Sequence, residues 1–167
     1  SFGLLTAAII KGISEYSQQE QAVNSLTRAM VNNGIYSQEL KKSYLEQADA
    51  LSKVTLFGDE QIIQAQSAFS QQARGIQLTK ENTKAILDFA QAQGIDAAQA
   101  AELVGKSVGT STNALARYGI EVSSTASKSE KMAQVLEGLN NKFGGQAEAA
   151  TSGLGSIQLL NKSKSFW

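Results

Sequence analysis

The run of residues in this sequence that most resembles a chemical motif is Val104-Gly105-Lys106-Ser107, which is similar to the end of a phosphate-binding loop. Such a loop follows a strand and needs an earlier glycine five residues before Gly105. That position holds Ala100, and the run continues a helical pattern. We therefore predict no nucleotide site, and we expect Gly105 and Gly109 to let two helices approach closely.

Acid–base and nucleophilic chemistry is equally poorly supported. Asp59 and Glu60 are adjacent, and adjacent residues of a helix do not face each other. Acidic residues favour the first turn of a helix, so we expect Asp59 to be an N-cap. The Lys-Ser pairs at 106–107 and 128–129 lack any supporting signature, and the chain has no His to serve as a base. We predict no catalytic residues and no enzymatic activity.

Composition excludes further classes of site. The chain has no Cys and no His, so the usual thiolate and imidazole ligands of transition metals are missing. No run of alternating Asp or Asn resembles a calcium loop. Fifteen basic and fifteen acidic residues give a net charge of zero, without a basic patch for nucleic acid. We expect no metal, no cofactor and no nucleic-acid recognition site, and we interpret the Gln-rich stretch 61–77 as a solvated or subunit-contacting face.

The elements that would position these residues are helices, because apolar residues recur at helical spacing along most of the chain. The 167 residues contain no Pro, which suits helices joined by short glycine turns. The nearest strand pattern, 119–123, is too short to build a sheet. We predict an all-α array of about seven to eight helices without a sheet. The expected helices run from residue 2 to 33, from Ser37 to the turn at Gly58, from Asp59 to Gly75, from Thr79 to Gly94, from Asp96 through Val104, briefly around Leu115 and Tyr118, from the Ser127/Glu130 capping box to Phe143, and from Gln146 onward.

Four expected helix ends share a Gly-Ile pair, at 34–35, 75–76, 94–95 and 119–120. In a Schellman motif, Gly adopts the left-handed conformation and the next apolar residue packs back onto the last turn. For Ile120 that partner would be Leu115. The repetition predicts helices that fold back on each other.

Three parts are expected along the chain: long N-terminal helices as a hairpin over 1–57, a compact multi-helix module over 58–145, and the start of a further helix over 146–167. The apolar segment 2–13 is too short to cross a bilayer and lacks the basic flank of a signal peptide. Because the sequence does not begin with Met, we expect a fragment of a longer chain.

Several short helical motifs, taken in order, resemble the tail tape measure proteins of long-tailed bacteriophages and prophages. The resemblance runs from about Ile9 to Ile157. The motifs are Glu20-Gln21 with Leu26, Ala48 to Leu51, Phe57-Gly58-Asp59-Glu60-Gln61-Ile62, Ala97-Ala98, Leu103-Val104-Gly105-Lys106-Ser107-Val108, Leu115, Tyr118-Gly119-Ile120-Glu121-Val122, and Phe143-Gly144-Gly145-Gln146-Ala147-Glu148-Ala149-Ala150.

This resemblance implies a structural role in a virion. Such proteins extend through the tail lumen, set tail length, are kept soluble by tail-assembly chaperones in the host cytoplasm, and leave through the tail tip when DNA is ejected. The implied partners are the tail tube protein, the chaperones and the tail tip proteins, with self-association possible and membrane contact only at infection. Residues 161–167 depart from the family pattern and receive no role.

Some members of the family also carry peptidoglycan-cleaving domains. The metallopeptidase type needs His ligands, which are missing here, and no transglycosylase glutamate motif is present. Two alternatives stay open beside the tape measure interpretation: a membrane-active or channel-forming helical segment, and a generic helical protein-binding module.

Overall fold

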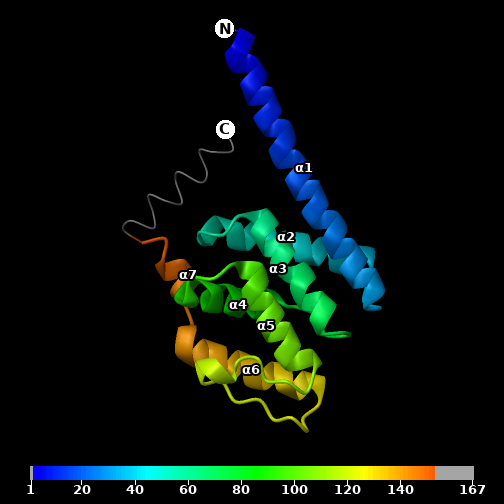
Figure 1. The fold of residues 1–167 in the computed structure, drawn as a ribbon, viewed down its shortest axis with the longest axis vertical. Coiled ribbons are helices and arrows are strands. Elements are labelled where there is room, and N and C mark those ends of the chain that lie inside the picture. The colour runs from blue at the N-terminus through cyan, green and yellow to red at the C-terminus, as the bar shows by residue number, and fades with distance from the viewer. Residues whose placement is uncertain (1, 153–167) are drawn as a thin grey trace.

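The computed structural model describes the backbone of residues 2–152 and the side chains from residue 17 onward. All regular structure in this range is helical, without a strand, which confirms the predicted all-α class (Figure 1). The elements are α1 (Phe2–Asn32), α2 (Gln38–Val54), α3 (Asp59–Gln72), α4 (Lys80–Gln93), α5 (Ala97–Gly109), the 3₁₀ turn η1 (Ala116–Tyr118), α6 (Lys128–Phe143) and α7 (Gln146–Ala149).

The predicted number of helices is too high. Two of the eight expected helices are single turns: the sixth is the three-residue η1, and the eighth is the four-residue α7. The described range thus holds six helices of 13 residues or more. The remainder of the expected eighth helix lies outside the described residues.

The central element is α3, which packs against α1, α2 and α5, while α4 packs against α5, α6 and α7. One hydrophobic core joins them, and it includes Leu26 of α1, Tyr44 of α2, Phe69 of α3 and Phe89 of α4. This core crosses the boundary expected at residue 57; the division into parts stays a prediction. At 1.5 Å per residue α1 is about 46 Å long, and Figure 1 shows its N-terminal half projecting beyond the other helices.

The closest helix crossing is that of α3 and α5, at the two glycines singled out in the sequence. A Cβ atom on Gly105 would lie 2.9 Å from the Cβ of Gln72 and 3.1 Å from the carbonyl oxygen of Phe69. A Cβ atom on Gly109 would collide with the carbonyl oxygen of Gln72. The predicted close approach is confirmed, because only glycine leaves room for the facing backbone.

Three of the four Gly-Ile helix ends form the predicted Schellman motif. The amides of Ile35, Ile95 and Ile120 donate to the carbonyls of Met30, Ala90 and Leu115, and each preceding glycine has a positive φ.

The fourth Gly-Ile pair differs. Although Gly75 also has a positive φ, α3 stops earlier, at Gln72, with Ala73 as its C-cap. The amide of Ile76 reaches only the carbonyl of Ala73. Gly75 therefore lies in the loop after the helix, and the prediction that it ends α3 is wrong by about one turn.

The N-caps were predicted well where a hydroxyl supplies them. The side chains of Ser37, Thr79 and Ser127 accept from the backbone amide three residues later, as expected. The Glu130 carboxylate accepts from the Ser127 hydroxyl at 3.2 Å, whereas a capping box requires it to accept from the Ser127 backbone amide, so only the Ser127 half of the predicted box is formed.

The two aspartates expected as caps behave differently. The N-cap of α3 is Gly58, whose amide donates to the side-chain oxygen of Gln61 at 2.8 Å, so Asp59 is the first helical residue instead. Asp96 holds the N-cap position of α5 but makes no side-chain capping bond. Because α3 begins one residue earlier than expected, Asp59 cannot hold the N-cap position.

Candidate functional site

The residues that suggested a phosphate loop are structural. Lys106 is exposed, whereas the neighbouring Ser107 is buried. The Ser107 hydroxyl donates to the carbonyl of Leu103 and accepts from the amide of Ala114 at 3.0 Å, so it anchors the loop that follows α5. Lysine and hydroxyl therefore do not meet at a common ligand position.

Asp59 links two helices. One carboxylate oxygen accepts from the side-chain amide of Gln19 in α1 at 3.1 Å, and the other accepts from the backbone amide of Glu60 at 2.9 Å. The contact holds α1 beside the start of α3.

The densest polar cluster is buried and centres on Gln47. Its amide nitrogen donates to the carbonyl of Leu78 at 2.9 Å, and its oxygen accepts from the hydroxyl of Thr83 at 2.9 Å and from the amide of Gln66 at 3.4 Å. Gln66 also donates to the carbonyl of Tyr44. This buried amide cluster joins α2, α3 and α4, since each helix contributes at least one member.

Gln66 corrects the interpretation of the Gln-rich stretch. Its side chain is fully buried, whereas Gln64 and Gln71 are exposed as a solvated face requires. The signal was present in the sequence: Gln66 lies four residues after Ile62 and three before Phe69, on the buried stripe of its helix.

Tyr44 is a buried tyrosine whose pKa is displaced by its surroundings. Its hydroxyl accepts from the amide of Leu78 at 2.7 Å and lies in the core. Burial raises the pKa of Tyr44 above its ordinary value of 10.0, because the phenolate would lose its hydration. The hydroxyl therefore stays protonated near neutral pH, where it positions the loop between α3 and α4.

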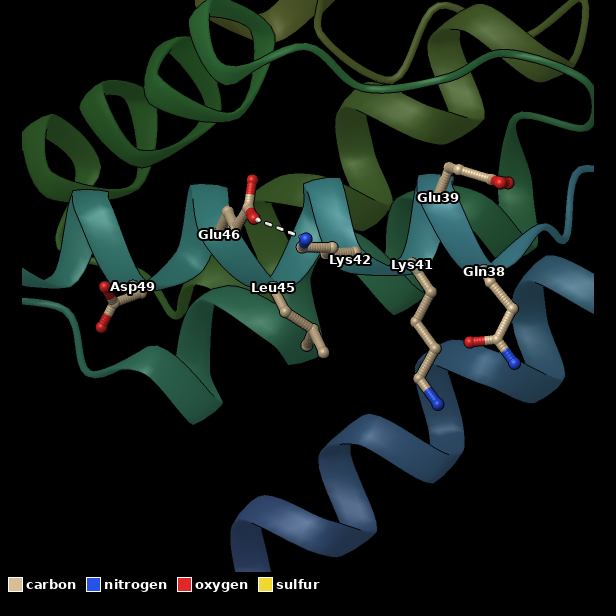
Figure 2. Close-up of a pocket in the computed structure, with 7 residues that line it drawn as sticks. All are labelled: Gln38, Glu39, Lys41, Lys42, Leu45, Glu46 and Asp49. Atoms are coloured by element: carbon tan, nitrogen blue, oxygen red, sulfur yellow. Dashed lines mark ion pairs between the residues drawn. The ribbon is translucent and has the colours of Figure 1, made fainter.

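A surface depression of about 640 Å³ lies along α2. Its lining mixes both charge signs, and Lys42 and Glu46 form an ion pair of 4.0 Å within it. Figure 2 shows Lys41 and Gln38 extending toward α1, with Leu45 between the charged side chains. The lining residues are Gln38, Glu39, Lys41, Lys42, Leu45, Glu46 and Asp49. This lining gathers no nucleophile with a base.

Two searches of the described residues bear on the remaining site classes. No group of three or more His, Cys, Asp or Glu side chains in the described range could hold a metal ion. Among the same residues, no helix combines the length and the apolar character that crossing a bilayer requires.

Comparison with known proteins adds no relative. No protein-family model, curated protein or solved structure matches this chain.

Proposed function

We propose that this chain is a non-catalytic helical module of a phage tail tape measure protein. The observation that carries the proposal is the ordered series of family-like motifs between about Ile9 and Ile157. The all-helical architecture is compatible with it, since such a module contributes length and packing rather than bond-making side chains.

Helices joined by glycine turns suit a protein that must fit a narrow tube. A helix rises about 1.5 Å per residue, so opening the turns would lengthen the module while the helices stay intact. Gly34, Gly94 and Gly119 each sit at a positive φ where one helix ends, and glycine can leave this conformation at little steric cost. The module would then be compact when free and extended in the tail lumen.

The proposed partners follow from this setting. The tail tube protein would surround the extended module, tail-assembly chaperones would cover its apolar helix faces in the host cytoplasm, and tail tip proteins would meet it before DNA ejection. The mixed charges along α2 would suit such transient protein contacts better than nucleic acid.

Tail length provides the test. We expect deletion of residues 2–152 from the parent chain to shorten tails by roughly 1.5 Å for each residue removed, on the order of 200 Å in total. Electron microscopy of purified virions measures this difference. Gly94→Val in the full parent chain is the control, because it weakens the compact form without changing the number of residues, and it should leave tail length unaltered. Tails of normal length from the deletion would contradict the proposal.

A further inference from the structure

Asp88 is a buried carboxylate in the middle of an apolar helix. It lies in α4 between Leu87 and Phe89 and is 2% exposed. Burying a charged group costs free energy unless hydrogen bonds replace its hydration. The hydrogen-bond donors that face the Asp88 carboxylate should therefore show which part of the structure it stabilises.

Both partners of Asp88 are backbone amides at the start of α7. One carboxylate oxygen accepts from the amide of Ala147 at 2.8 Å, and the other accepts from the amide of Gly145 at 3.1 Å. First-turn amides have no partner within their own helix, and the helix dipole favours an anion there. Asp88 thus caps a helix that lies 57 and 59 residues further along the chain.

Besides these two bonds, α7 is held by its packing on α4, where Ala147 is fully buried in the core. The helix α7 has four residues, too few for a helix to persist without outside support. A Gly144-Gly145 pair joins it to α6, and Gly145 has a φ of 83°. Among the described helices α4 is its principal neighbour, and the only ion pair recorded between them joins the partly exposed Lys84 and Glu148 at 3.6 Å.

The two helices that meet at Asp88 differ in how they are held, because α4 has aromatic contacts that do not involve α7. The Phe89 ring, next to Asp88, packs edge-on against Tyr118 at 4.8 Å and against Phe143 at 5.6 Å. These rings hold α4 to η1 and to the end of α6 without α7. Departure of α7 would withdraw Ala147 from the core but would leave these ring contacts in place.

We propose that α7 is a releasable latch, which Asp88 holds closed on α4. When the two hydrogen bonds open, residues 145–152 separate from α4 while α1 to α6 remain folded. The latch is a property of the fold and goes beyond the role in a phage tail.

Amide hydrogen exchange on the whole chain tests the latch. Asp88→Asn keeps the shape of the side chain, but its NH₂ group faces one of the two amides and cannot accept from it. We expect the amides of Ala147, Ala149 and Ala150 to exchange at least about tenfold faster, because charge-assisted bonds are lost. The amides of Val135 and Leu139 in α6 should keep their rates within about twofold.

Two further variants sharpen the result. Asp96→Asn is the control, because Asp96 holds the N-cap position of α5 but makes no side-chain capping bond, and it should change neither set of amides. Gly145→Ala strains the exposed link at positive φ without touching the core, and it should accelerate the same α7 amides as Asp88→Asn. Equal acceleration in α6 and α7, or none in α7, would overturn the latch.

Discussion

At the scale of single residues, Gln47 and Gln66 belong to the same buried cluster but differ in how many of their polar atoms are hydrogen-bonded. Both polar atoms of Gln47 are used, toward Leu78, Thr83 and Gln66. Gln66 donates through its nitrogen, yet its buried oxygen has no partner. Unpaired buried polar groups cost more than the average hydrogen bond contributes, so the two glutamines should respond differently to substitution.

We predict that Gln47→Met destabilises the fold by about 1–3 kcal/mol, because it leaves the buried carbonyl of Leu78 without its side-chain donor. Gln66→Met removes an unpaired oxygen together with the donor, so the two effects offset, and we expect a change within about 1 kcal/mol. Urea unfolding followed by circular dichroism gives both values. A larger loss for Gln66→Met than for Gln47→Met would refute this view of the cluster.

At the scale of elements, the packing of α3 on α5 depends on glycines that helix propensity disfavours. Alanine is preferred over glycine in a helix interior by about 1 kcal/mol. Both Gly105 and Gly109 nevertheless face the backbone or Cβ of Gln72 at distances that exclude a methyl group. Packing and propensity therefore oppose each other at these positions.

The variant Gly109→Ala shows whether helix propensity or the close packing of α3 on α5 has the larger effect on stability. We expect a net destabilisation of about 1–3 kcal/mol, because the added Cβ forces α3 and α5 apart. Glu102→Ala, at an exposed position of the same helix, should change stability by no more than about 0.5 kcal/mol. Thermal and urea unfolding measure both variants; a stabilised Gly109→Ala would show that propensity prevails and that the crossing can relax.

Most helix ends were predictable from the sequence, whereas contacts between distant residues were not. Hydroxyl caps such as Ser37 and Schellman ends such as Gly94 act within a few residues of the chain, so the sequence predicted them. Asp59, Asp88 and Gln66 have distant partners, and a pattern of nearby residues carries no information about those. Asp88 left only one trace, an acidic residue inside the apolar run 85–90. That the chain has no catalytic residues remains a prediction, made from its composition.

At the scale of the whole molecule, the described core begins well inside α1. Its first buried member is Ala22, followed by Leu26 and Met30, while residues 17–20 are exposed. Figure 1 shows the preceding part of α1 continuing away from the other helices. The stability of the body should therefore depend on the second half of this helix.

We predict that a chain beginning at Ser17 unfolds cooperatively, with a melting temperature within a few degrees of the full chain, because it keeps every described core side chain. Leu26→Ala in the same shortened chain is the comparison, and it should cost about 2–5 kcal/mol through the cavity it leaves. Differential scanning calorimetry distinguishes the two. Loss of the cooperative transition on shortening alone would place part of the core before residue 17.

The central position of α3 has a mechanical consequence. Because α3 is enclosed by α1, α2 and α5, it would be among the last helices to separate when the chain is pulled from its two ends. The four-residue α7 and the projecting half of α1 would bear the load first, and each would yield at low tension. The protein would then lengthen from its two ends toward its middle, with the largest resistance met when α3 parts from α5.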